Sequence, residues 1–406
     1  MPHHVILALT ALLFLLFGAF SKRFERGMFT APMFCVLVGL AAGPLGLGLV
    51  ELQLDNEVLT IIAEVALAVI LFTDASGITL SRLRQAWSLP ARLLGIGLPL
   101  TILLGMLAAI PFLPEIPLIW LAVMACILAP TDAALGVAIV QSPLVPQRVR
   151  DTLNVESGLN DGIALPLILA LFVLAAVQGA TAAESQGWLL AMVQELALGA
   201  LVGAAIGQLG GRLLDAAWRR GWMEETFARL VSPGLAILAF SSANLMNLNG
   251  FVAAYLAGLL LGVRDEEFRE KLRAFGEADG AQFSLFVFLL FGLSFLPVAI
   301  PHWNAPILAY ALLSLTLVRM LPVALGLAGA GLDSVTIAFI GWSGPRGIAS
   351  VLYLTLVLDR FGIQGHETIF AAIVLTVFLS IFLHGISAAP LARAYGGYVQ
   401  ARKPAE

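Results

Sequence analysis

One apolar stretch of the chain carries a dense group of polar residues, Asn154, Glu156, Ser157, Asn160 and Asp161. Residues four apart share a helix face, which pairs Glu156 with Asn160 and Ser157 with Asp161. Carboxylate, amide and hydroxyl oxygens are the ligands that hard cations prefer. A desolvated carboxylate can hold a proton instead, because burial raises the pKa of such a group. A single carboxylate here is therefore sufficient to exchange a cation for a proton.

Two other apolar stretches are interrupted at proline, in segments 130–132 (Pro-Thr-Asp) and 344–347 (Gly-Pro-Arg-Gly). Proline removes a backbone donor and clashes with the preceding turn, so each stretch is predicted to be a broken helix. The two breaks are roughly 215 residues apart, and paired broken helices near the bilayer midplane indicate a transport site.

The composition places these groups in a membrane. The chain has 406 residues, 60% hydrophobic and only 12% charged, about half the charged fraction of a soluble domain. This excludes a soluble enzyme, a disordered chain, a disulfide scaffold and a nucleic-acid binder. We expect an all-α polytopic membrane protein with about thirteen helices, because its apolar runs are long enough to cross a bilayer. They are placed near residues 5–20, 29–50, 57–74, 90–112, 116–141, 153–178, 188–211, 227–245, 250–263, 280–297, 304–328, 334–358 and 367–391.

The basic residues give the orientation. Of the 22 Lys and Arg residues, all except Arg319, Arg346 and Arg360 fall in alternate loops or in the C-terminal tail. The positive-inside rule makes that side cytoplasmic, with the N-terminus outside and the C-terminus inside. The localisation expected is a cell membrane, the inner membrane of a bacterium.

The spans also repeat. Helices one to six fall on helices eight to thirteen after a shift of roughly 214 to 223 residues, which leaves the seventh as a connector. The two halves then enter the membrane in opposite senses. This inverted-topology repeat is the common plan of secondary transporters.

Charges inside membrane spans are costly and usually mark function. At 1.5 Å per helical residue, Asp132, Asp161, Arg319 and Arg346 lie about 12 to 18 Å from the cytoplasmic ends of their helices. All four are therefore near the bilayer centre. We expect Glu156 to form an ion pair with Arg319 at similar depth.

Three further groups have two open interpretations each. Glu64 and Glu195 are either protonated contacts within the protein or face an aqueous cavity. His384 is interpreted as a packed histidine, with a proton relay as the alternative.

On these motifs the chain resembles the monovalent cation/proton antiporters, in the branch of sodium/proton exchangers and NhaP-like proteins. The similar segments are 39–48, 130–132, 156–161, 251–258 and 344–347. The resemblance implies electroneutral exchange of Na⁺, and of Li⁺ as well, for H⁺ by an elevator-type movement, and a role in pH homeostasis. It implies no cofactor, and its partners are the cation, the proton, the lipid bilayer and a second copy in a homodimer.

The resemblance also implies roles for individual residues. Asp161 and Asp132 are the expected Na⁺ ligands, with Thr131, Ser157 and Asn160 close by. A Glu156–Arg319 salt bridge and Arg346 beside the unwound helices are expected to balance charge.

The resemblance implies a single transporter domain over residues 1–391. Its core helices are expected at about 90–178 and 304–391, its dimerisation helices at about 5–74 and 227–297, and its connector at 188–211. Residues 392–406 form a short cytoplasmic tail in this scheme.

Alternatives remain open at this point. Potassium is a second candidate ion, because residue types do not set ligand distances or cavity size. A rhomboid-like intramembrane serine protease is a candidate of another class, with Ser343 as nucleophile and His384 as base. It leaves Asp132 and Asp161 without a role. A channel or an organic-anion symporter on a similar scaffold is the third alternative.

Overall fold

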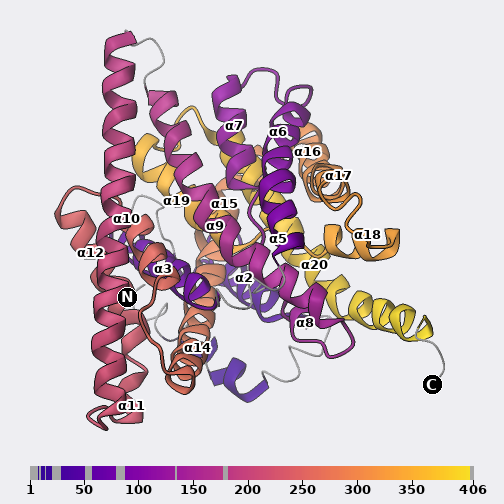
Figure 1. Cartoon of the computed structure of the whole chain (residues 1–406). Coiled ribbons are helices and arrows are strands. Elements are labelled where there is room, and N and C mark those ends of the chain that lie inside the picture. The colour runs from indigo at the N-terminus through magenta and orange to yellow at the C-terminus, as the bar shows by residue number, and fades with distance from the viewer. Residues whose placement is uncertain are drawn as a thin grey trace. The chain divides into compact units, whose positions relative to one another are not determined.

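The computed structural model describes residues 8, 11–13, 15–20, 29–50, 57–78, 87–132, 135–176 and 182–402, whose regular structure is helical (Figure 1). They include only part of the predicted helix 5–20. The basic residues Lys22, Arg23, Arg26, Arg82, Arg84 and Lys403 lie outside them. The chain divides into two compact units. The first holds Met1–Thr60, Gln85–Asn160 and Ser284–Glu406, and the second holds Ile61–Arg84 and Asp161–Phe283.

The first unit contains both predicted breaks. Its helices are α2 (Ala31–Ala42), α5 (Ser88–Arg92), η1 (Leu93–Gly97), α6 (Leu98–Ala109), α7 (Leu118–Ile127), α8 (Val137–Val140), the first part of α9 (Gln147–Ala176), η2 (Phe291–Phe295), α15 (Leu296–Ala299), η3 (Ile300–His302), α16 (Ala305–Leu315), α17 (Leu317–Gly326), α18 (Ser334–Trp342), α19 (Ile348–Phe361) and α20 (Glu367–Ala401). Within it α20 packs against α16, α18 and α19, and α6 packs against α7.

The second unit is built around a long helix. It contains most of α3 (Glu57–Ser76), the rest of α9, α10 (Ala182–Arg219), α11 (Glu225–Ala228), α12 (Val231–Leu245), α13 (Gly250–Leu259) and most of α14 (Glu266–Leu290). Helices α10, α12 and α13 pack on one another. Glycines allow direct backbone contact: a Cβ on Gly203 would lie 2.1 Å from the Ala253 carbonyl oxygen. Small residues commonly permit such close approach between membrane helices.

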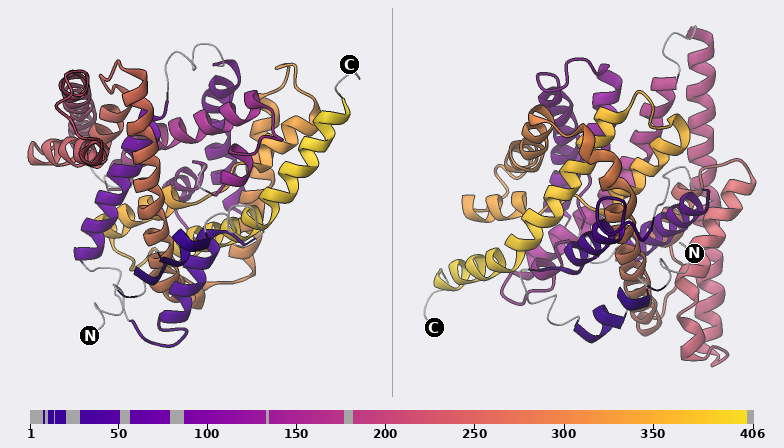
Figure 2. Two further views of the ribbon diagram at one scale, coloured as in Figure 1. Left: turned by 90° about the horizontal axis from the view of Figure 1, so that it is seen from below. Right: turned by 180° about the vertical axis from the view of Figure 1, so that it is seen from behind.

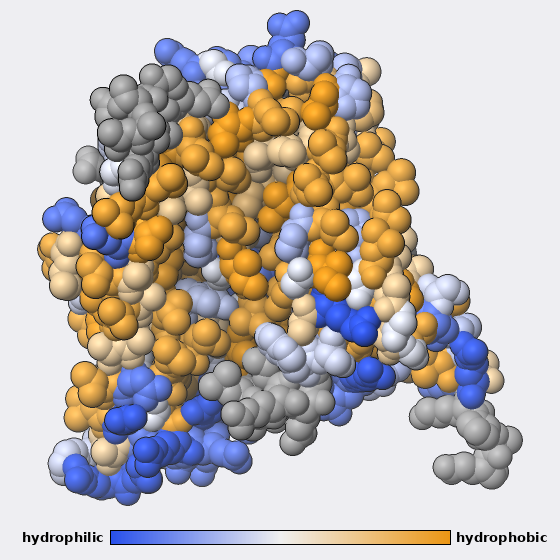
Figure 3. Space-filling model, turned by 45° about the horizontal axis from the view of Figure 1, so that its top comes forward, coloured by the Kyte–Doolittle hydropathy of each residue, from blue (hydrophilic) through white to orange (hydrophobic). Residues whose placement is uncertain are grey.

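The surface fits a lipid environment. Seven helical segments within the described residues are long and apolar enough to cross a bilayer: Ser88–Ala109, Gln147–Ala176, Gly187–Arg219, Glu225–Leu245, Glu266–His302, Ala305–Gly326 and Glu367–Ala401. Hydrophobic residues cover most of the face shown in Figure 3, and hydrophilic residues gather toward its ends. The class of an all-helical membrane protein is confirmed, whereas the full helix count and the inverted repeat stay predictions.

Both predicted breaks are present. Helix α7 ends at Ile127 and the next helical residue described is Val137. Helix α18 ends at Trp342, and residues 343–347 have no helical structure before α19 begins at Ile348. Proline accounts for both, because neither Pro130 nor Pro345 can donate a helical hydrogen bond.

A third break was not predicted. The stretch 304–328 is divided at Thr316, whose φ of −110° and ψ of −95° are not helical. Its hydroxyl donates to the Leu312 carbonyl at 2.7 Å. Neither glycine nor proline stands at Thr316, so local sequence carried no signal for this break.

Several helices extend beyond their predicted ends. Helix α14 starts at Glu266 and not near 280, because the Asp265 carboxylate accepts the Phe268 amide at 2.9 Å and caps it. The basic residues Arg269, Lys271 and Arg273 are therefore helical. Helix α20 continues to Ala401, so most of the predicted tail is helical (Figure 2).

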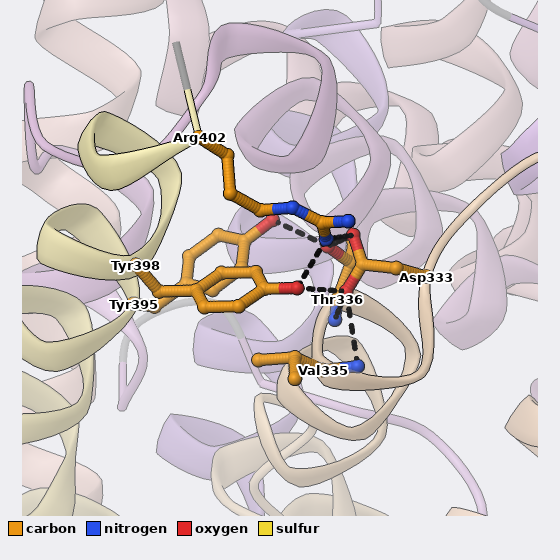
Figure 4. Close-up of polar contacts among 6 residues, drawn as sticks. All are labelled: Asp333, Val335, Thr336, Tyr395, Tyr398 and Arg402. Atoms are coloured by element: carbon orange, nitrogen blue, oxygen red, sulfur yellow. Dashed lines mark hydrogen bonds and ion pairs between the residues drawn. The ribbon is translucent and has the colours of Figure 1, made fainter.

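Polar contacts fix the end of α20 to the start of α18 (Figure 4). Asp333 caps α18 by accepting the amides of Val335 and Thr336, each at 3.0 Å. The same carboxylate accepts the Tyr398 hydroxyl at 3.2 Å and faces Arg402 at 3.6 Å. The hydrogen bond from the Thr336 amide is the main reason why the pKa of Asp333 is below its usual value.

We expect Asp333→Ala to lower the free energy of unfolding by about 1 kcal/mol, the usual contribution of an N-cap. A depressed pKa gives stability above the ordinary carboxylate pKa that is lost as pH falls through the lowered value. The difference from wild type should therefore be full at neutral pH and shrink in strong acid. Unfolding in detergent at both pH values measures it. Asp333→Asn keeps an acceptor oxygen and should lose less; equal losses for both variants would contradict the capping role.

Candidate functional site

The two breaks are joined to each other through Asp132. Its amide donates to the Pro345 carbonyl oxygen at 2.8 Å. Its carboxylate Oδ2 accepts the Ile348 amide at 2.8 Å, at the first residue of α19. A carboxylate at that position satisfies an otherwise unpaired amide and interacts favourably with the positive end of the helix dipole.

Arg346 lies beside the first break, fully buried. Its Nη1 donates to the carbonyl oxygens of Ala129 and Pro130, the latter at 3.2 Å. These carbonyls follow the C-terminal end of α7, where the helix dipole is negative. The expected position of Arg346 near the unwound helices agrees with this geometry. Its own amide donates to Ser380 Oγ at 2.7 Å, which fixes the second break to α20.

Two side chains of helix α9 form hydrogen bonds with the first break. The Ser157 hydroxyl donates to the Thr131 carbonyl oxygen at 2.7 Å. The Asn160 amide Nδ2 donates to Thr131 Oγ1 at 2.7 Å. All three residues are buried. Asn160 Oδ1 is buried and has no hydrogen-bond partner among the described residues. The structure thus gathers three of the candidate ion-binding residues around one backbone segment.

Glu156 and Arg319 form the expected pair. Arg319 Nη2 lies 2.7 Å from Glu156 Oε1, and each side chain is 3% exposed. The break at Thr316 precedes Arg319 by one turn. Gly344 packs against the guanidinium so closely that a Cβ on this residue would lie 2.6 Å from Arg319 Nε. The ion pair therefore joins α9 to α17 next to Gly344 of the second break.

Asp161 follows Asn160 directly on the continuous helix α9 and is 4% exposed. It is part of the second compact unit, whereas Thr131, Asp132, Ser157 and Asn160 are in the first. Beside it, Gly162 packs on a ring from the segment 251–258, because a Cβ on Gly162 would lie 2.1 Å from Tyr255 Cζ. Hydropathy and residue spacing do not predict this contact, because the two residues are far apart in the chain.

A small cavity lies between the broken helices. Its volume is about 10 Å³, on the scale of a single water molecule. Its lining includes four residues with side-chain oxygens, Thr131, Asp132, Ser157 and Ser343. The other lining residues are Gly136, Ile139, Val140 and Leu153. Asp132 and Ser157 therefore line one cavity together with Ser343 from the second break.

Four further candidate residues have the following surroundings. Glu64 is half-buried on α3, and Glu195 is exposed on α10. Ser343 Oγ donates to the Phe339 carbonyl at 2.6 Å, while His384 Nδ1 lies 3.2 Å from Ser380 Oγ. The nucleophile and base of the protease alternative are thus bonded to different groups.

At position 347, next to Asp132, there is no space for a side chain. A Cβ there would lie 2.0 Å from Asp132 Oδ2. We expect Gly347→Ala to displace this carboxylate from α19 and to lower the transport rate about tenfold or more, as misplaced site groups do. Gly341→Ala is the control, because its Cβ would meet Met320 at an ordinary 3.5 Å. Initial transport rates of both variants in proteoliposomes test this, and equal rates would count against it.

A comparison with known protein families identifies the family of this chain. Residues 8–394 match the family described as sodium/hydrogen exchanger, transmembrane. The chain belongs to the sodium/hydrogen exchanger family. Members of this family are transporters and not enzymes, which removes the protease alternative.

The named relatives of this chain differ in their ion. The K⁺/H⁺ antiporter NhaP of Alkalimonas amylolytica is 29% identical over 371 residues, 89% of this chain and 62% of that protein. A probable Na⁺/H⁺ antiporter of Schizosaccharomyces pombe is 26% identical over 273 residues, 61% of this chain and 34% of that protein. The chain thus spans less than two thirds of the length of these relatives.

A solved structure shows the same fold. The sodium proton antiporter MjNhaP1 from Methanocaldococcus jannaschii at pH 8 superposes on this chain with a TM-score of 0.76. The match covers 98% of this chain and 100% of that one at 22% identity.

Proposed function

We propose that this exchanger is a secondary active antiporter that moves a monovalent cation in one direction and a proton in the other. The observation that carries the proposal is the oxygen-rich junction of two broken helices with α9. There Thr131, Asp132, Ser157 and Asn160 are held by the hydrogen bonds described above. Half-helix ends and unwound backbone are the usual ion sites of secondary transporters.

Asp161 is proposed as the group that holds either the cation or the proton. It is buried, and it lies one helical turn after Ser157 on the same helix. A buried carboxylate in a membrane span can bind a cation when it is charged, and it can bind a proton in place of that cation. Because one site alternates between the two, each cation is exchanged for one proton and the exchange is electroneutral.

Sodium is the proposed cation, with Li⁺ as a related substrate and K⁺ as the alternative. The names of the relatives include both K⁺/H⁺ and Na⁺/H⁺ antiporters. An elevator-type movement of the core and assembly as a homodimer are proposed with it, in a bacterial inner membrane with the N-terminus outside and the C-terminus in the cytoplasm.

Purified protein in proteoliposomes tests the function. Internal pH is followed after external addition of Na⁺, K⁺, Li⁺ or choline, with the membrane potential first clamped and then varied. Proton movement driven by Na⁺ and independent of potential is expected. Movement driven by K⁺ would keep the antiport mechanism and replace the ion, while dependence on potential would contradict electroneutrality. Absence of cation-driven proton movement would refute antiport.

A further inference from the structure

We infer that Ser343 supplies an oxygen ligand to the transported cation and contributes to the selection among Li⁺, Na⁺ and K⁺. The inference rests on the proposed antiport function and adds a ligand from the second broken helix. Ser343 is the residue that follows α18, where the unwound segment 343–347 begins. It is 8% exposed and lines the same cavity as Thr131, Asp132 and Ser157.

The hydroxyl of Ser343 is oriented to accept. Its proton is donated to the Phe339 carbonyl oxygen at 2.6 Å. A hydroxyl whose single proton is used in this way has only lone pairs left to offer. Ser157, which also lines the cavity, likewise donates its proton to a backbone carbonyl, that of Thr131, at 2.7 Å. Two serine oxygens are thus presented to one cavity as acceptors, which is the ligand type that hard cations prefer.

The position of Ser343 makes it a determinant of selectivity. The cavity of about 10 Å³ is bounded by oxygens from three elements: the first break, α9 and the second break. Selectivity between hard cations depends on cavity size, ligand number and flexibility. Ser343 is the polar residue by which the second break contributes to this lining, so removing its hydroxyl changes the ligand number without changing the net charge.

A purely structural role makes a different prediction. If the hydroxyl only satisfied the Phe339 carbonyl at the end of α18, its loss would alter folding and the rates for all cations alike. A ligand role alters the apparent KM values unequally. The ratio of these values among Li⁺, Na⁺ and K⁺ therefore separates the two roles.

The test compares Ser343→Ala with Ser350→Ala in proteoliposomes. Ser350 is a matched control, because its buried hydroxyl also donates to a backbone carbonyl, that of Ile127 at 2.8 Å, yet it does not line the cavity. We expect Ser343→Ala to raise the apparent KM of the preferred cation about fivefold to tenfold, the scale of one lost polar interaction. Its KM ratios among the three cations should shift, while Ser350→Ala keeps the wild-type ratios. Unchanged ratios in Ser343→Ala would overturn the inference.

A second measurement does not depend on a variant. Crystals of the wild-type protein soaked in Tl⁺, a heavy monovalent cation, should show anomalous density in contact with Ser343 Oγ. Density that contacts Ser157 and the carboxylates but not Ser343 would also overturn the inference. Wild-type protein without any cation-driven proton movement would instead remove the proposed function itself, so the two failures are distinguishable.

Discussion

Asp161→Asn is expected to reduce cation-driven proton movement in proteoliposomes to the level of empty liposomes. Asparagine has nearly the same shape, but it neither releases a proton nor carries the charge that a cation would neutralise. Asp161 is buried on α9, and because asparagine fills nearly the same volume, we expect the variant to keep the fold. The measurement is the initial rate of internal pH change after addition of Na⁺, K⁺ or Li⁺.

The matched control for this variant is Asp151→Asn. Asp151 lies on the same helix near its start and is half-buried. The same chemical change there should leave the rate close to that of wild type. Full activity of the Asp161 variant would move the exchange site to another carboxylate, and Asp132 would be the next one to test.

The second large effect concerns stability. Glu156→Ala is expected to lower the free energy of unfolding by about 3 to 5 kcal/mol, the usual cost of leaving one member of a buried ion pair alone. The Arg319 side chain is 3% exposed, so water cannot replace its partner. The side chain is also closely packed against Gly344, where an added Cβ would lie 2.6 Å from Arg319 Nε.

The double variant Glu156→Leu/Arg319→Met separates charge from packing. It removes both charges together, and buried pairs replaced by apolar residues often regain stability. We therefore expect the double variant to be more stable than Glu156→Ala, with a large coupling energy in a double-mutant cycle. Unfolding in detergent, followed by circular dichroism, measures all forms. If the Glu156→Ala variant is as stable as wild type, the ion pair between α9 and α17 does not stabilise the fold.

The membrane class and the broken helices were predictable because their causes are local. Long apolar runs must cross a bilayer wherever they stand in a chain. Pro130 and Pro345 interrupt a helix through their own rings. The polar group from Asn154 to Asp161 stood out because oxygen-bearing side chains are costly in such a run. Even the Glu156–Arg319 pair followed from depth, since each charge needed a partner near the same level.

The helix ends were less predictable. Hydropathy marks the apolar part of a helix, whereas α14 and α20 continue through polar residues outside it. Their ends depend on caps and on packing, such as Asp265 at the start of α14 and the Asp333 contacts near the end of α20. The break at Thr316 was likewise not predictable from local sequence, because neither glycine nor proline stands at this position.

Residue types and helical spacing select the candidate residues, whereas the packing of distant segments sets which backbone groups each one contacts. Residue types and helical spacing identify Asp132 and Arg346 as charges at two breaks. They do not reveal that Asp132 accepts the Ile348 amide or that Arg346 donates to carbonyls of the first break. The residues around Ser343 in the sequence suggest only a nucleophile, whereas in the fold Ser343 lines a cavity together with Asp132 and Ser157. The physical reason is that hydropathy and helix periodicity are set along one chain segment, whereas a hydrogen-bond partner depends on how distant segments pack.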